Sequence, residues 1–172
     1  MLFNRIVSLV ILALGVIAPV IACSPVGSQV FKPIGSKPML HTDSKTGYVA
    51  HPPAPVIDSI AVHRGTGSDG ASCADAGSLT IELSLPEESE FSLNELGFYF
   101  RVVEGENILA GHSVPFAPFS QEGKHGRFVL FWLDGAPSEQ KPINLVVEAF
   151  ALTNYLEIGP AVRFAVKSGV GR

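Results

Sequence analysis

The chain contains two cysteines, Cys23 and Cys73, whose thiols could undergo covalent chemistry. Cys23 comes directly after a long apolar run, and Cys73 lies in a stretch rich in Gly, Ser and Asp. In an oxidising compartment the two thiols could form one disulfide. Acylation of Cys23 is the alternative, and it would leave Cys73 without a cysteine partner in the same chain.

The segment before Cys23 has the features of a signal peptide. Asn4 and Arg5 form a short, positively charged start, and residues 6–21 follow as an uncharged apolar run that contains Pro19 near its end. A membrane-spanning helix needs about 20 apolar residues and normally lacks a proline at such a position. We therefore expect residues 1–22 to be a signal peptide that is removed on export.

The residues Val20-Ile21-Ala22-Cys23 resemble the lipobox of bacterial lipoproteins. In that family the cysteine is acylated and the chain is cleaved before it, so the resemblance implies a lipid anchor on Cys23 that binds the membrane. It also implies a place in the cell envelope, and Ser24 after the cysteine implies the outer membrane. An ordinary signal-peptidase site would accept Val20 and Ala22 equally, and would give a soluble periplasmic or secreted protein with a Cys23–Cys73 disulfide.

The other polar residues form no pattern typical of a catalytic or metal site. The histidines are far apart in the sequence, at His41, His51, His63, His112 and His125. Asp134 and the neighbouring Gly indicate a turn rather than a calcium ligand. We expect no cofactor, no metal and no catalytic residue. The alternative is an envelope enzyme subunit whose site is built from distant loops, which would need His112, His125 and the acidic residues at 87–90 to meet.

Composition and charge favour one folded domain that does not bind nucleic acid. Hydrophobic residues make up 47% of the 172 residues, and the formal net charge is −4. Nucleic-acid binding requires a basic surface, and neither the net charge nor the scattered Lys and Arg residues predict one. Residues 23–54 are rich in Pro, Gly and Ser, so we expect a tether that spans on average about 30 Å as a random coil. The predicted domain covers 55–168, and 169–172 are expected to be a flexible tail.

Short runs of β-branched and aromatic residues predict an all-β domain. The expected strands are Val56 to His63, Ser78 to Leu85, Leu96 to Glu104, Gly126 to Leu133, Ile143 to Leu152 and Ala161 to Lys167. The prolines at 115 and 118 make residues 114–119 an edge strand at best. About seven strands of this length predict an antiparallel two-sheet sandwich. Residues 46–50, within the tether, are a further possible edge strand.

The last two expected strands resemble the closing hairpin of fibronectin type III domains. The resemblance is carried by Leu145 to Asn154, which contains Val-x-Ala, and by Gly159 to Val166. It implies a fibronectin-like or immunoglobulin-like sandwich.

The strand from 126 to 133 is apolar on both faces, so its alternation does not indicate which face is buried. We assign Val129, Phe131 and Leu133 to the core. This assignment leaves Phe128, Leu130 and Trp132 to be covered by a loop, the tether or a partner. With Val146 and Phe150 they could form an apolar patch for a protein or glycan of the cell envelope. The alternative is that a crossing strand or a long loop of the same chain buries them. The resulting hypothesis is a non-enzymatic binding or structural module.

Overall fold

A computed structural model describes residues 26–35, 51–67, 74–109 and 114–169. The described residues form seven strands and a short 3₁₀ helix. In chain order these are β1 (Val56–His63), β2 (Ala76–Ser84), η1 (Leu93–Glu95), β3 (Leu96–Glu104), β4 (Ser120–Glu122), β5 (His125–Leu133), β6 (Ile143–Thr153) and β7 (Val162–Ser168). Within these residues, no helix has the length and apolar character needed to cross a membrane.

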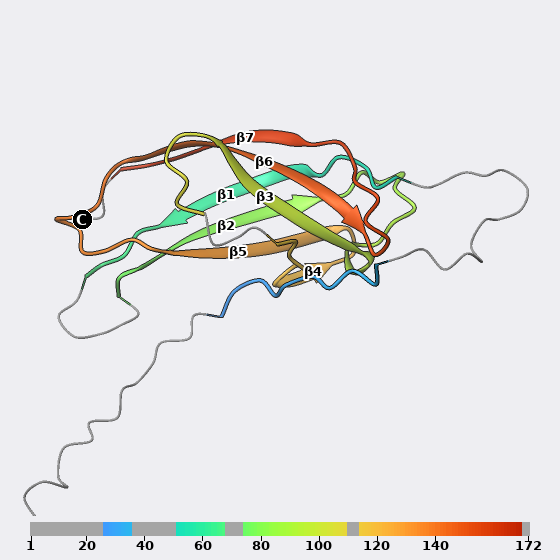
Figure 1. The fold of residues 1–172 in the computed structure, drawn as a ribbon, viewed down its shortest axis with the longest axis horizontal. Coiled ribbons are helices and arrows are strands. Elements are labelled where there is room, and N and C mark those ends of the chain that lie inside the picture. The colour runs from blue at the N-terminus through green and yellow to red at the C-terminus, as the bar shows by residue number, and fades with distance from the viewer. Residues whose placement is uncertain (1–25, 36–50, 68–73, 110–113, 170–172) are drawn as a thin grey trace, which may run out of the picture.

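The strands form two antiparallel sheets that pack against each other (Figure 1). One sheet has the order β1-β2-β5-β4, and the other has the order β3-β6-β7. This is the strand order of the immunoglobulin constant-type sandwich. The predicted all-β sandwich of about seven strands is therefore confirmed.

The core lies between the sheets and contains the residues that alternate along each strand. Leu79 and Ile81 of β2 are buried opposite Phe98 and Phe100 of β3, as their alternation predicts. The ring of Phe128 from β5 lies 5.1 Å from the ring of Phe98 and 5.2 Å from the ring of Phe100. Tilted aromatic pairs of this kind are favourable, and here they join the two sheets.

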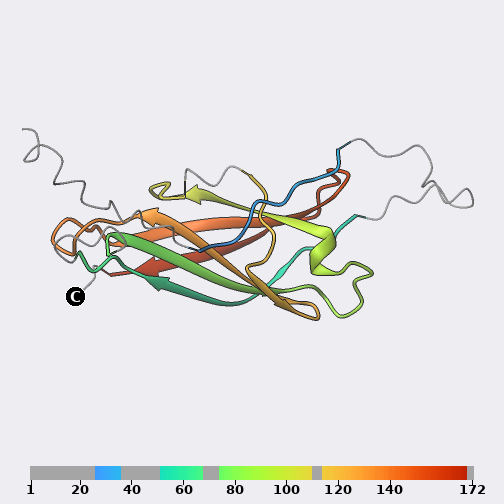
Figure 2. The same ribbon diagram turned by 90° about the horizontal axis from the view of Figure 1, so that it is seen from below.

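Residues 26–35, which we call the N-terminal strap, pack along one open side of the sandwich. Figure 2 shows the strap crossing this side between β5 and β3. The Ser28 N–H donates to the Val129 carbonyl at 3.0 Å, and the Ser28 hydroxyl accepts from the Val129 N–H at 3.0 Å. At its other end, the Ile34 N–H donates to the Asn154 carbonyl at 3.0 Å.

The centre of the strap is held by Phe31, whose side chain is buried. Its N–H donates to the Pro115 carbonyl at 2.8 Å, and its ring occupies the space that a side chain at Gly97 would need. The prediction of a free tether is therefore wrong for residues 26–35. Pro and Gly remove the strand alternation from this segment, but isolated backbone hydrogen bonds still dock it. Residues 36–50, with the possible edge strand at 46–50, lie outside the described residues.

Residues 114–119 pass from one sheet to the other. Phe116 and Phe98 exchange two backbone hydrogen bonds of 2.8 and 2.9 Å at the edge of β3. Three residues later, the Phe119 N–H donates to the Arg127 carbonyl at 2.7 Å, and the chain continues as β4 on the edge of β5. This short edge strand was not predicted, because its three polar residues carry no apolar alternation.

Candidate functional site

The structure contradicts the predicted patch at two of its five residues. Phe128 and Leu130 are only 0% and 1% exposed, whereas Leu133 is 86% exposed, so the face of β5 that we assigned to the core is the outer one. The reason is the pairing with β2, in which Leu130 lies opposite Leu79 and Phe128 lies opposite Ile81. Opposite residues in an antiparallel pair point to the same face, so the clear alternation of β2 determines which face of β5 is buried.

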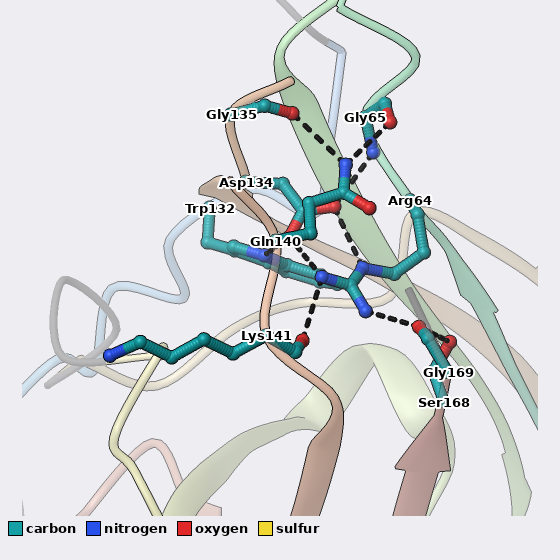
Figure 3. Close-up of polar contacts among 9 residues, drawn as sticks. All are labelled: Arg64, Gly65, Trp132, Asp134, Gly135, Gln140, Lys141, Ser168 and Gly169. Atoms are coloured by element: carbon teal, nitrogen blue, oxygen red, sulfur yellow. Dashed lines mark hydrogen bonds and ion pairs between the residues drawn. The ribbon is translucent and has the colours of Figure 1, made fainter. Parts of the chain in front are cut away.

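Trp132 closes one end of the core and is half-buried. Its indole N–H donates to Asp134 Oδ1 at 3.1 Å, as Figure 3 shows. Val146 and Phe150 lie on β6, with Phe150 stacked on Tyr99 at the outer face of the second sheet. The predicted patch is therefore not a single surface.

A buried ion pair between Arg64 and Asp134 lies at the Trp132 end of the sandwich (Figure 3). Arg64 Nε donates to Asp134 Oδ2 at 2.8 Å, and Arg64 Nη2 donates to Oδ1 at 2.9 Å. Further donations from the guanidinium reach the carbonyls of Lys141 and Gly169. The pair thus joins the end of β1, the end of β5 and the residue after β7.

The Asp134 carboxylate accepts two more hydrogen bonds, from the Gly65 N–H at 2.7 Å and from Trp132. Burial is the largest single influence and raises the pKa of Asp134, but the hydrogen bonds from Arg64, Gly65 and Trp132 together lower this pKa below its usual value. Nearby, the Gln140 amide donates to the Gly65 carbonyl at 2.6 Å and to the Gly135 carbonyl at 3.0 Å. The groups of Arg64, Gly65, Trp132, Asp134 and Gln140 therefore bond one another, and we call this set of contacts the clasp.

A pocket of about 260 Å³ opens beside this clasp. Its wall includes Trp132 and Leu133 and the charged side chains of Glu106, Glu139 and Lys141. The Lys141 ammonium lies 3.8 Å from a Glu106 carboxylate oxygen, and both side chains are largely exposed. The lining of the pocket mixes apolar and polar side chains, and its two buried charges, Arg64 and Asp134, are already paired with each other.

Three of the histidines lie in the described residues, at His51, His63 and His125; the positions 41 and 112 do not. His125 Nδ1 lies 3.4 Å from Asp58 Oδ2, and the Ser84 hydroxyl donates to Asp58 Oδ1 at 3.0 Å. The hydroxyl therefore bonds the carboxylate rather than the imidazole, unlike a serine that a histidine activates as a nucleophile. Within the described part of the chain, no three His, Cys, Asp or Glu side chains are grouped to hold a metal.

The acidic loop that contains Glu87, Glu88 and Glu90 is distant from Lys124 in the sequence but contacts it in the fold. The Lys124 ammonium donates to the carbonyls of Pro86 at 3.1 Å and Ser89 at 2.9 Å, and also to that of Glu87. The side chains of Glu87, Glu88 and Glu90 are exposed. This lysine therefore holds the backbone of the loop and leaves its carboxylates in solvent.

The outer face of the β3-β6-β7 sheet carries an ion cluster that sequence reasoning missed. Glu148 on the central strand has a buried side chain that accepts from Arg101 on β3 and from Arg163 on β7, with Nε to oxygen distances of 2.8 and 2.9 Å. The hydrogen bond from Arg163 and then that from Arg101 lower the pKa of Glu148. Two cations share one carboxylate, so the cluster has a net positive charge.

An aromatic pair continues this cluster along the sheet. The rings of Tyr99 and Phe150 are stacked at 5.2 Å, and the Arg101 guanidinium lies 5.9 Å from the centre of the Phe150 ring. Both arginine side chains of the cluster are about two-thirds exposed, at 65% and 64%. The sequence could indicate only that Arg101 and Glu148 lie at outward positions of two expected strands. That the two residues face each other depends on the register of β3 and β6, which the sequence does not give.

Cys23, the predicted lipidation site, lies outside the described residues, as does Cys73. The predicted tail is described only at Gly169, whose carbonyl accepts from Arg64. No protein-family model, no curated protein and no solved structure is significantly similar to this chain.

Proposed function

We propose that this protein is a bacterial envelope lipoprotein, anchored by acyl chains on Cys23, whose sandwich domain binds another envelope protein without catalysing a reaction. The anchor rests on one observation, the lipobox-like Val20-Ile21-Ala22-Cys23 at the end of a signal segment. More than one acyl chain is needed for stable anchoring, and the acylated cysteine of a lipoprotein carries several.

The outer face of the β3-β6-β7 sheet supports the binding role. Tyr99, Phe150 and the guanidinium groups of Arg101 and Arg163 are the kinds of group that contribute most to protein interfaces. The ion cluster is positive although the chain has a net charge of −4. We therefore propose a partner whose contact surface carries carboxylates.

The anchor is tested by the intact mass of the protein purified from its membrane fraction. We expect a mass above that of the chain from Cys23 to Arg172 by the acyl chains and glycerol, and we expect Cys23→Ser to abolish this increase and release the protein from the membrane. A bare chain that gains two hydrogen atoms on reduction would contradict the proposal, and would indicate a soluble protein with a Cys23–Cys73 disulfide.

The binding surface is tested by a photoreactive amino acid placed at Tyr99, with Thr80 as the matched control on the outer face of the other sheet. We expect cross-linking in cells from the Tyr99 position, and an at least several-fold loss of it when Arg101 and Arg163 are both changed to Glu, because like charges then face the acidic partner. Equal cross-linking from both positions would contradict this assignment.

A further inference from the structure

The strap has an outward face that is mostly apolar. Burial does not alternate regularly along the strap, since Gln29 and Val30 are both exposed. Phe31 points into the domain, while Val26, Val30 and Ile34 are exposed. Large apolar side chains that are exposed within one short segment need an explanation, because single exposed ones are ordinary and grouped ones mark contact surfaces.

The adjoining segment 114–119 adds to this apolar surface. It contacts the strap through the bridge between Val30 and Phe116 and through the hydrogen bond from the Ala117 N–H to the Gln29 carbonyl at 2.8 Å. Val114 and Phe119 in this segment are also exposed. Of the nine large hydrophobic residues that are exposed among the described residues, five therefore lie in these two neighbouring segments.

The charge of this edge suits a lipid surface. Residues 26–35 and 114–119 contain no Asp or Glu, and Lys32 is their one charged side chain. It is exposed on the strap between Val30 and Ile34. Apolar side chains with a nearby cation are the usual composition of a face that rests in the headgroup region of an anionic bilayer.

The covalent reach from the anchor to this edge is short. Three peptide units separate Cys23 from Val26, and each spans at most about 3.6 Å, so their Cα atoms are at most about 11 Å apart. Because the strap is docked from Ser28 onward, the domain has no longer linker with which to stand away from the membrane.

We propose that the edge made by residues 26–35 and 114–119 lies on the bilayer, with Val26, Val30 and Phe119 in its interfacial region. This inference rests on the proposed acylation of Cys23. It makes the lipid surface, rather than a second protein, the occupant of this edge, and it leaves the outer face of the β3-β6-β7 sheet available to the protein partner.

The test uses the full-length acylated protein in vesicles of phosphatidylethanolamine and phosphatidylglycerol with brominated acyl chains, which quench tryptophan fluorescence. We compare Val30→Trp with Val56→Trp, because Val56 is an exposed valine on β1, at the opposite edge of its sheet from β4. The signal of Trp132 is measured in the unsubstituted protein and subtracted. We expect the bromines to remove roughly half of the fluorescence added by Val30→Trp and almost none of that added by Val56→Trp.

Equal quenching of the two variants would overturn the inference. Ile34→Trp provides a second reporter on the same edge if Val30→Trp disturbs the bridge to Phe116. An edge that instead joins two copies of the chain would shield the added indole from water without bromine quenching, which would also overturn it. The intact mass of the same sample separates the two proposals: an acylated protein without quenching overturns this inference alone, whereas a bare chain overturns the lipid anchor as well.

Discussion

Arg64 and Asp134 are 70 positions apart, yet their side chains form the most completely bonded polar contact in the described part of the protein. A buried carboxylate beside a pocket is a usual sign of catalysis. Here every hydrogen bond to Asp134 comes from a group that itself belongs to the fold, and the lowered pKa keeps the carboxylate ionised. The same geometry that makes the pair a good clasp makes it a poor acid or base.

The clasp predicts a particular loss of stability in acid. Because the folded-state pKa of Asp134 lies below its unfolded value, the unfolded chain binds the proton first as the pH falls. The stabilisation is complete above the unfolded pKa of about 3.9 and is lost as the pH falls through the folded-state pKa. Asp134→Asn should lower the free energy of unfolding at neutral pH by about 3 kcal/mol, because Arg64 is left buried without a counter-charge.

Urea denaturation at several pH values between about 7 and 3 measures both effects, as the difference between Asp134→Asn and the unsubstituted protein. This difference removes the contributions of other carboxylates with a lowered pKa, such as Glu82, Glu95 and Glu148. Glu106→Gln is the control, because the exposed Glu106–Lys141 pair should contribute little at any pH. A constant difference down to the most acidic pH would contradict the assignment of the lowered pKa to Asp134.

At the scale of the elements, the sequence predicts a strand well where one face is apolar and the other polar. The bounds of β1 and β3 agree with the prediction, and those of β2 and β6 differ by a residue or two at their ends. β5 was found, but its orientation was wrong, because a strand that is apolar on both faces has no alternation to read. The strap was missed for a related reason: its prolines and glycines hide a segment that docks through a few hydrogen bonds and one buried phenylalanine.

The docking of the strap depends on a glycine on the neighbouring strand. A Cβ at Gly97 would overlap the ring of Phe31, so Gly97→Ala should push the strap away and destabilise the protein by about 1 to 3 kcal/mol. The amides of Ser28 and Phe31, which are bonded in the docked strap, should then exchange hydrogen faster. Mass spectrometry of deuterium uptake measures this change.

Gly169→Ala is the matched control for Gly97→Ala, because among the described residues, its chain neighbours aside, no atom lies within 4 Å of a Cβ at Gly169. It should change neither the stability nor the exchange of the strap. If Gly97→Ala leaves deuterium uptake in residues 26–35 unchanged, the strap is not held by the packing of Phe31.

At the scale of the whole molecule, the sandwich could be predicted from the sequence but its surfaces could not. The number of strands and the spacing of turns limit the fold to few alternatives. The Arg101, Glu148 and Arg163 cluster and the clasp depend on register and on contacts between distant segments, for which one sequence has no local signal. The lipobox-like segment differs, because the lipid anchor is predicted from four consecutive residues and needs no knowledge of the fold.

The strap also determines how the molecule should respond to force. A pull on the residues before Val26 would load the Ser28 hydrogen bonds first, then those of Gln29 and Phe31, and then that of Ile34. The paired strands of the sandwich would be loaded only afterwards. The strap would therefore peel bond by bond while the two sheets keep their shape. Its ten residues, once peeled and extended, would lengthen the link by about 35 Å. With the proposed lipid anchor on Cys23, the docked strap would hold the domain close to the membrane at rest, and the peeled strap would let it move away under tension.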